Sequence, residues 1–145
     1  MDSGSRSDTL TAVPWYRAVM VWMVLMLFET LHGAVREVFI APRIGALHAR
    51  QLGVPVGCAI VFVVAWFAAR WLGATMRAQQ LVVGGLWVLL TLLFEFTLGR
   101  AVGTSWNQML SDYNPARGGL MVLGLVFMFV TPMLVARPHS REILK

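Results

Sequence analysis

The sequence predicts an all-α fold: an integral membrane four-helix bundle. Its mean hydropathy is +0.70, and 58% of its 145 residues are hydrophobic. Only 13% are charged, against about a quarter in soluble proteins. A soluble domain of this size has too little interior to bury so much apolar surface, whereas a bilayer covers it with lipid.

Four apolar stretches give the predicted helices, which span residues of about 14–36, 51–71, 79–98 and 118–136 in a domain of residues 13–137. About 20 helical residues cross a hydrocarbon core that is roughly 30 Å thick. Pro55 and Pro132 fall inside the second and fourth helices, where proline kinks a membrane helix or marks its end. Residues 1–12 are predicted to be a disordered tail and residues 138–145 a C-terminal tail.

The first stretch has an alternative interpretation. Its uninterrupted apolar run, Ala18–Phe28, has the length of a signal-peptide core, and Arg6 and Arg17 precede it. A retained helix is favoured, because the third stretch repeats the same Leu-Phe-Glu sequence and lies too far along the chain to be a signal peptide.

Local patterns indicate a duplication. The sequence Leu-Phe-Glu ending at Glu29, followed by Gly33, recurs ending at Glu95, followed by Gly99. Each copy also closes its second helix with Ala-Arg. The pattern predicts two duplicated helical hairpins that run in parallel about an axis near the membrane normal.

Basic residues predict the orientation. On the side of the termini lie seven: Arg6, Arg17, Arg70, Arg77, Arg137, Arg141 and Lys145. On the other side lie five: Arg36, Arg43, Arg50, Arg100 and Arg117. The difference favours an orientation with both termini in the cytoplasm. We interpret these short clusters as topology determinants and lipid-headgroup contacts, and we expect no nucleic-acid binding.

Ionisable residues inside the apolar stretches mark the candidate site. Glu29, His32 and Arg36 have the spacing i, i+3 and i+7, which projects them from one helical face. Glu95 repeats the position of Glu29, and Arg100 follows it. One interpretation is a structural Glu29–Arg36 ion pair. The other is a working site, in which neighbouring glutamates exchange protons or bind a cation.

No cofactor or metal is expected. Glu29 and His32 form the Glu-x-x-His motif of di-iron bundles, but those sites need the motif twice, and the second copy has Leu98 in place of histidine. Haem ligation by His32 and His48 lacks an attachment motif. Cys58, the single cysteine, is interpreted as a small apolar side chain. No phosphate-binding, dinucleotide or hydrolase motif occurs, so we do not expect an enzyme.

Two further patterns concern packing. Gly53-x-x-x-Gly57 and Gly99-x-x-x-Gly103 predict close packing between helices of the same chain. Residues 106–115 predict a short amphipathic helix that stops before a proline. That segment is interpreted as a membrane-surface anchor or as a lid over the glutamates, and its candidate lid or interface residues are Trp106, Asp112, Tyr113 and Arg117.

The chain resembles a group of uncharacterised small bacterial inner-membrane proteins with four predicted helices. The residues that carry the resemblance are Glu29-Thr30-Leu31-His32-Gly33 with Arg36, Ala49-Arg50-Gln51 with Gly53, Phe94-Glu95 with Gly99, and Ser105-Trp106 with Asp112-Tyr113-Asn114 and Arg117-Gly118. The resemblance covers most of residues 22–120. It implies a bacterial inner-membrane location and carries no activity.

These observations predict a polytopic inner-membrane protein with a buried Glu/His/Arg cluster, structural or auxiliary to a membrane complex. Its expected partners are the lipid bilayer and either another membrane protein or further copies of the chain. An alternative is a small proton- or cation-coupled transporter acting as a homo-oligomer, with Glu29 and Glu95 as the titrating groups. A third is a metal- or haem-binding redox subunit.

Overall fold

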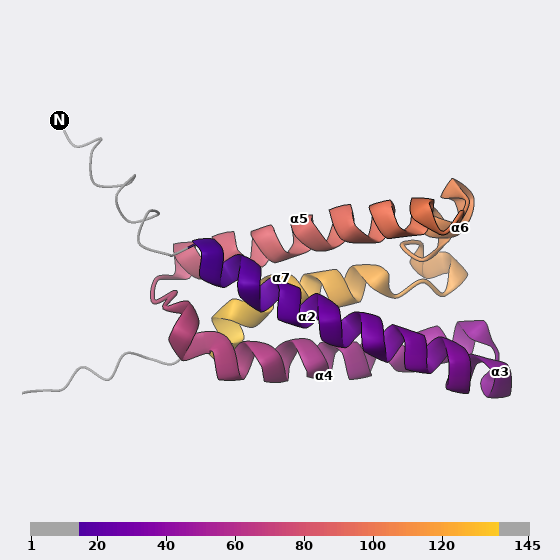
Figure 1. Ribbon diagram of the computed structural model, residues 1–145, viewed down its shortest axis with the longest axis horizontal. Coiled ribbons are helices and arrows are strands. Elements are labelled where there is room, and N and C mark those ends of the chain that lie inside the picture. Colours follow the sequence, from indigo (N-terminus) through magenta and orange to yellow (C-terminus); the bar gives the residue numbers. More distant parts are fainter. Residues whose placement is uncertain (1–14, 137–145) are drawn as a thin grey trace, which may run out of the picture.

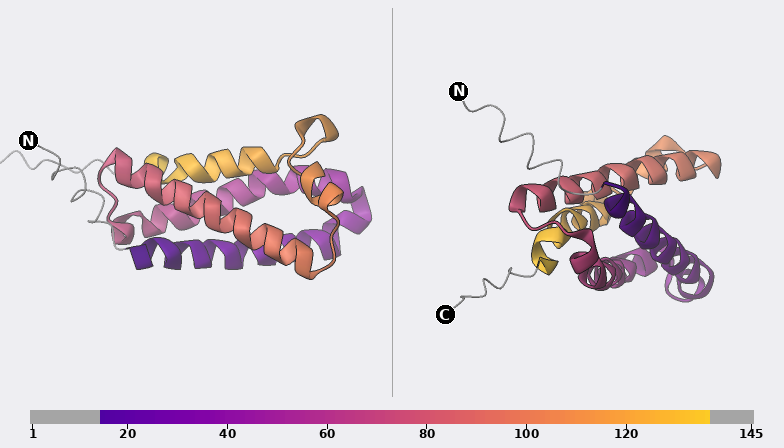
Figure 2. Two further views of the ribbon diagram at one scale, coloured as in Figure 1. Left: turned by 90° about the horizontal axis from the view of Figure 1, so that it is seen from above. Right: turned by 60° about the vertical axis from the view of Figure 1, so that its left-hand side comes forward.

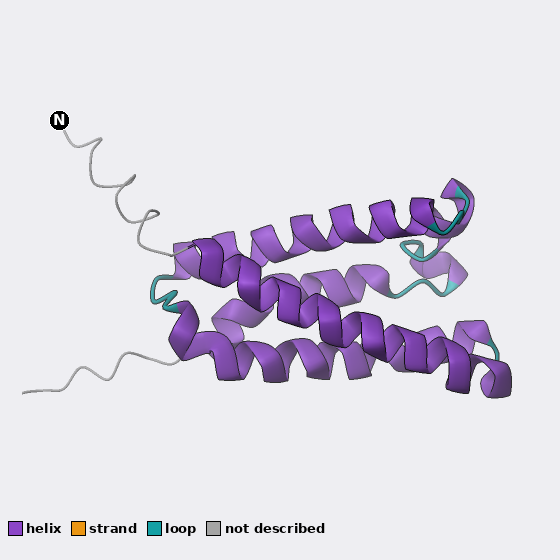
Figure 3. Ribbon diagram, in the orientation of Figure 1, coloured by secondary structure: helices purple, strands orange, loops and turns teal. Residues whose placement is uncertain are grey.

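The computed structural model describes residues 15–136, and within them every regular element is helical (Figure 3). The long helices are α2 (Trp15–Val35), α4 (Ala46–Leu72), α5 (Arg77–Ala101) and α7 (Met121–Val135). The short ones are the π-helix η1 (Arg36–Ile40), α3 (Ala41–Ile44), α6 (Trp106–Ser111) and the 3₁₀ turn η2 (Pro115–Arg117). The predicted all-α class is confirmed. The predicted tails, residues 1–12 and 138–145, lie outside the described residues.

The four long helices lie side by side (Figures 1 and 2). Helix α2 packs on α4 and α5, and α7 packs on the same two helices. Trp15, the loop of residues 73–76 and Val135 lie at one end, which we call the near end. Helices α3 and α6 lie at the opposite end, which we call the far end.

Three segments are long and apolar enough to cross a membrane: Trp15–Ile44, Ala46–Leu72 and Arg77–Ala101. Helix α7 is also apolar, but it has only 15 residues. At 1.5 Å per residue it is about 22 Å long.

The connection between α2 and α4 differs from the prediction, which ended the first helix near residue 36 and began the second near residue 51. The chain stays helical through η1 and α3, and only Gly45, at φ 86°, breaks it before α4 begins at Ala46. Pro42 lies in the first turn of α3, where its missing N–H costs no hydrogen bond. The π turn η1 therefore lets a proline follow α2 without ending the helical path.

Two tryptophans join α2 to α5. The buried Trp87 donates its indole N–H to the carbonyl oxygen of Ala18 at 2.9 Å. Trp22 donates its indole N–H to the Thr91 hydroxyl oxygen at 3.1 Å and packs edge-on against Phe94. A buried indole N–H needs such a partner, so these contacts fix where the two helices cross.

Helix α5 meets α7 at a glycine. A Cβ atom built on Gly84 would lie 2.1 Å from the carbonyl oxygen of Phe129. The neighbour is backbone, which cannot rotate away as a side chain can. Only glycine therefore allows the observed approach of the two helices.

At the near end, side chains hold the turn between α4 and α5. The Gln79 side-chain oxygen accepts from the backbone N–H groups of Thr75 and Met76, at 3.1 and 3.2 Å. Arg17 donates to the Trp71 carbonyl oxygen at 2.8 Å, and its guanidinium lies over the Tyr16 and Trp71 rings. These bonds satisfy backbone groups that a helix end leaves unpaired.

We expect Gly84→Ala to destabilise the fold and Gly85→Ala to leave it unchanged or slightly more stable. The first methyl group collides with the Phe129 backbone, and overpacking of this kind costs about 1–3 kcal/mol. The second would meet only the Phe129 ring, at 3.8 Å, while removing a helical glycine. Thermal unfolding in mild detergent measures the difference. Equal unfolding midpoints for the two variants would show that α5 and α7 do not approach at Gly84.

Candidate functional site

The inward face of α2 changes from apolar to polar towards the far end. Ala18 and Leu25 on this face are fully buried. Glu29, His32 and Arg36 follow, and each is partly buried. His32 Nδ1 lies 3.7 Å from Glu29 Oε2, with side-chain exposures of 15% and 25% respectively. The predicted grouping of these three residues on one helical face is therefore present.

Glycines of α4 make room for these polar side chains. A Cβ atom on Gly57 would lie 3.1 Å from Glu29 Oε2, and one on Gly53 would lie 3.0 Å from Arg36 Nη1. The prediction that Gly53-x-x-x-Gly57 packs within the chain is confirmed. These two glycines allow α2 and α4 to approach each other. They also leave space on α4 for the side chains of Glu29 and Arg36.

The predicted Glu29–Arg36 ion pair does not form. Among residues 15–136, no nitrogen–oxygen distance of 4.0 Å or less joins Glu29 or Glu95 to an arginine. Arg36 nevertheless acts electrostatically on Glu29, His32 and Glu95. Within the same residues, Glu29 Oε1 and Arg36 Nε are buried without a hydrogen-bond partner. Buried polar atoms are normally hydrogen-bonded. Here Glu29 Oε1 could still accept a hydrogen bond and Arg36 Nε could still donate one.

Glu95 of α5 is more exposed than the partly buried Glu29, His32 and Arg36 of the predicted cluster. Trp87, Thr91 and Glu95 follow at spacings of one turn along α5, and the first two are 0% and 3% exposed. Beyond the crossing at Trp22, α2 and α5 move apart towards the far end (Figure 1). The inward face of α5 is therefore uncovered where its glutamate lies.

Arg100 does not join the cluster. Its guanidinium carbon lies 5.3 Å from the centre of the Trp106 ring. A side chain five residues after Glu95 is rotated by about 140° from it on an α-helix. Helical geometry therefore directs Arg100 to the α6 segment.

The segment that follows α5 folds back onto α5 and α4. Its helix ends at Ser111, earlier than the predicted stop before Pro115. The buried Met109 lies against Gly99, and Tyr113 stacks on Phe96 with ring centres 5.9 Å apart. Asp112 forms an ion pair with Arg50 of α4.

The lid interpretation stays a prediction, although two of its residues, Asp112 and Tyr113, interact electrostatically with Glu95. The charge of Asp112 acts on Glu95, and the charge of Glu95 acts on Tyr113. Trp106 and Arg117 are exposed. The sequence did not single out Arg50 and Phe96 as anchors of this segment, since neither occurs in a motif with its partner.

The duplicated positions have different surroundings. A Cβ atom on Gly33 would meet no atom within 4 Å, whereas one on Gly99 would lie 2.9 Å from Met109 Cε. Glu29 lies against Gly57, whereas Glu95 is exposed. The matched residues therefore do not repeat one local environment.

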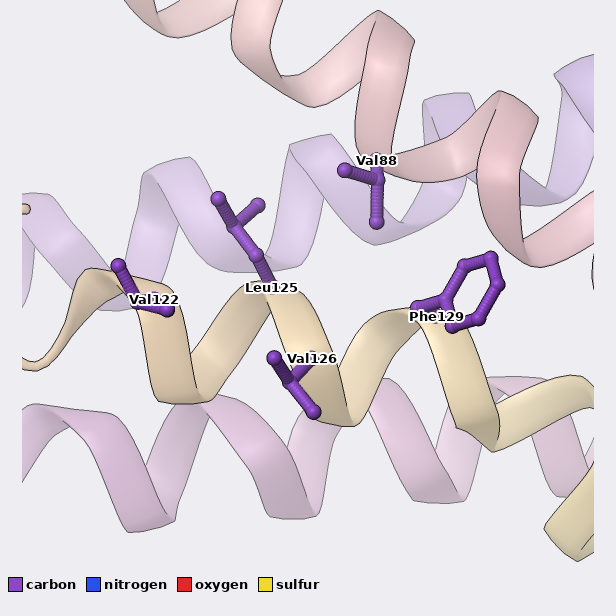
Figure 4. A pocket seen from close by; sticks show the side chains of 5 residues that line it. All are labelled: Val88, Val122, Leu125, Val126 and Phe129. Carbon is purple, nitrogen blue, oxygen red and sulfur yellow. The ribbon is translucent and has the colours of Figure 1, made fainter.

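Two apolar surface hollows lie away from Glu29, His32 and Arg36. One lies at the surface of α5 and α7 and is lined by Val88, Val122, Leu125, Val126 and Phe129 (Figure 4). Another, on α4, is lined by Phe62, Val63, Trp66 and Phe67. Their aliphatic and aromatic lining suits lipid chains. Among residues 15–136, no group of three or more His, Cys, Asp or Glu side chains is arranged to hold a metal ion.

Comparison with known proteins found no relative: no family model matches the chain, and no curated protein or solved structure matches it either. The resemblance to uncharacterised bacterial membrane proteins stays a prediction.

We expect the phenol of Tyr113, which lies outside the long helices, to ionise above its ordinary pKa of 10.0. Burial raises this pKa, and the charges of Glu95 and Asp112 raise it further. The pKa of Tyr113 is higher in the folded protein than in the unfolded chain. The contribution of its neutral phenol to the free energy of unfolding is therefore complete below pH 10 and is lost as the pH rises through the folded-state pKa.

Tyrosinate absorbance in a Tyr16→Phe background isolates Tyr113, since the chain has two tyrosines. Glu95→Gln should lower the midpoint, whereas Glu37→Gln, an exposed carboxylate in η1, serves as the matched control. A midpoint at or below 10.0 would contradict the described burial of Tyr113.

Proposed function

We propose that this chain is a non-enzymatic, multi-pass protein of a bacterial inner membrane and serves as a structural or auxiliary subunit of a membrane complex. Exposed apolar side chains on all four long helices support insertion. Phe67 of α4, for example, is 80% exposed. Such a surface is unfavourable in water, whereas lipid covers it.

In the proposed arrangement, α2, α4, α5 and α7 cross the membrane as a four-helix bundle. Helix α7 supports this placement because it packs between α4 and α5. Its length of about 22 Å is less than the roughly 30 Å of a hydrocarbon core. Flanking residues or local thinning of the bilayer must therefore make up the difference. The origin of the bundle as two duplicated hairpins is part of this proposal and rests on the sequence match.

The near end is proposed to face the cytoplasm, because more of the basic residues fall on that side of the sequence. Of the seven basic residues counted on that side, Arg17, Arg70 and Arg77 lie among the described residues. Both termini then lie in the cytoplasm.

We expect a C-terminal fluorescent protein, which folds only in the cytoplasm, to fluoresce, and a C-terminal alkaline phosphatase to stay inactive. The same reporters placed after residue 104, between α5 and α6, should give the opposite pattern. Phosphatase activity at the C-terminus would overturn the proposed orientation.

The observation that carries the auxiliary role is the exposure of Glu95. The residue continues the stripe of the buried Trp87 and Thr91 along α5, yet residues 15–136 leave it partly exposed. A carboxylate within the hydrocarbon region is costly and normally faces protein or water. A neighbouring subunit that covers Glu95 removes this cost, which supports a place in a larger complex.

A second candidate is a proton- or cation-coupled transporter that works as a homo-oligomer. It is supported by the unpartnered Glu29 Oε1 atom and by the charge of Arg36, which acts on both glutamates. For a transporter, Glu29→Gln or Glu95→Gln should abolish flux in proteoliposomes at unchanged abundance. For an auxiliary subunit, the same variants should lower abundance instead.

We expect Arg36→Gln to lower the amount of protein in the membrane several-fold, because a loss of about 1–2 kcal/mol of stability changes abundance by that factor. The substitution leaves two carboxylates without the cation that acts on both. Adding Glu29→Gln should restore part of the loss, since one uncompensated charge is removed.

Quantitative immunoblots of membrane fractions measure these effects. Arg43→Gln is the matched control, because exposed Arg43 donates only to the Phe39 carbonyl oxygen at the far end. Equal abundance of the Arg36 and Arg43 variants would sink the idea that Arg36 balances the glutamates.

A further inference from the structure

The charges of the described chain are distributed unevenly between its two ends. Its carboxylates all lie in the far half of the molecule: Glu29, Glu37, Glu95 and Asp112. The near end carries Arg17 at the start of α2, Arg70 at the end of α4 and Arg77 at the start of α5 (Figure 1). Among residues 15–136, no carboxylate forms an ion pair with any of these three arginines. The near end of the described chain is therefore basic without internal compensation.

Arg17 is held in one position by its neighbours. Its Nε donates to the Tyr16 hydroxyl oxygen at 3.1 Å, and its Nη1 donates to the Trp71 carbonyl oxygen at 2.8 Å. The guanidinium carbon lies 5.7 Å from the centre of the Tyr16 ring and 5.4 Å from the centre of the Trp71 ring. A guanidinium has more N–H groups than these two bonds use, so it can still donate to a ligand. Arg17 is thus a pre-oriented, charged donor at the junction of α2 and α4.

Exposed aromatic side chains lie beside this arginine. Trp15, Tyr16 and Trp71 are 43%, 58% and 43% exposed, and all three belong to the near ends of α2 and α4. Tryptophan and tyrosine gather at the level of the lipid headgroups, where their rings meet acyl chains and their polar groups meet water. In the proposed membrane arrangement, the near-end arginines therefore lie at the depth of the lipid phosphates.

We propose that the near end binds the phosphate group of an anionic phospholipid. The Arg17 guanidinium donates hydrogen bonds to phosphate oxygens, while Arg70 and Arg77 attract the net charge of the lipid from the ends of α4 and α5. A ligand that binds only the folded chain raises its stability, so the lipid strengthens this end of the bundle. The inference rests on the proposed insertion into a membrane. It does not depend on the auxiliary role or on which side of the membrane the near end faces.

The charge pattern favours anionic over zwitterionic lipids. Both carry a phosphate, but the cationic group of phosphatidylcholine balances that phosphate and leaves no net charge. A surface with arginines and no carboxylate gains more from a headgroup with net negative charge. The far-end arginines differ, because Arg50 pairs with Asp112 and the charge of Arg36 acts on Glu29 and Glu95. The lipid preference is therefore expected to come from the near end.

The test titrates the full-length chain in mild detergent with phosphatidylglycerol or phosphatidylcholine and measures bound lipid by native mass spectrometry. Phosphatidylglycerol should bind more tightly than phosphatidylcholine. Arg70→Gln combined with Arg77→Gln should weaken phosphatidylglycerol binding about fivefold for each arginine removed, which corresponds to about 1 kcal/mol. The matched control, Arg43→Gln combined with Arg117→Gln, removes the same charge from exposed far-end arginines and should keep the preference.

Thermal unfolding gives a second readout. Phosphatidylglycerol should raise the unfolding midpoint of the unchanged chain and of the far-end variant more than that of the near-end variant. Arg17→Lys keeps the charge but loses the planar arrangement of donors, so it should reduce this lipid-induced shift whatever its midpoint without lipid. Equal binding of the two lipids, or equal losses in the near-end and far-end variants, would overturn the proposal. Inorganic phosphate that raises the midpoint as much as phosphatidylglycerol would overturn it in favour of a site for a free anion.

Membrane insertion and lipid binding can fail separately. If the chain is recovered in the membrane fraction and the reporter after residue 104 behaves as expected, but the two lipids bind equally, only the lipid proposal fails. If the chain is absent from the membrane fraction, the proposed function fails first and the lipid site fails with it.

Discussion

The crossing of α2 and α5 at two indole hydrogen bonds is the constraint on which the rest of the structure depends. Trp87 bonds to Ala18 and Trp22 bonds to Thr91, so the helices are held at one level and not along their whole length. In the proposed membrane setting no hydrophobic effect drives the remaining parts of α2 and α5 together, because lipid chains are as apolar as the side chains. Towards the far end α2 and α5 diverge (Figure 1), and Glu29, Arg36 and Glu95 all lie in that half of the molecule.

The polar residues of α2 and α5 meet different surroundings. Glu29 and Arg36 lie against glycines of α4, which give charged groups room inside an apolar bundle. Glu95 is exposed on α5. The positive charge of Arg36 attracts its carboxylate as well as that of Glu29. The Asp112–Arg50 pair closes the adjoining corner by joining the α6 segment to α4. The far end of the molecule thus combines the Asp112–Arg50 ion pair with the exposed carboxylate of Glu95.

The sequence predicted what depends on composition and helical spacing: the all-α class, the four apolar stretches, and the common face of Glu29, His32 and Arg36. It missed what depends on long-range packing. The Arg50–Asp112 pair and the Phe96–Tyr113 stack join residues far apart in the chain, and no local pattern encodes them. Glu95 was expected to be buried because it repeats Glu29. Exposure depends on which neighbour lies opposite, and α2 has already turned away at that level.

Spin-label distances in lipid bilayers test the central claim most directly. In a Cys58→Ser background, one labelled pair, Met20 and Leu89, brackets the crossing, and a second pair, Leu31 and Leu98, reports on the far end; all four positions are exposed. The structure predicts a clearly longer distance for the second pair than for the first. Equal distances, or a shorter one at the far end, would mean that α2 and α5 stay together along their length, and that Glu95 is covered within its own chain.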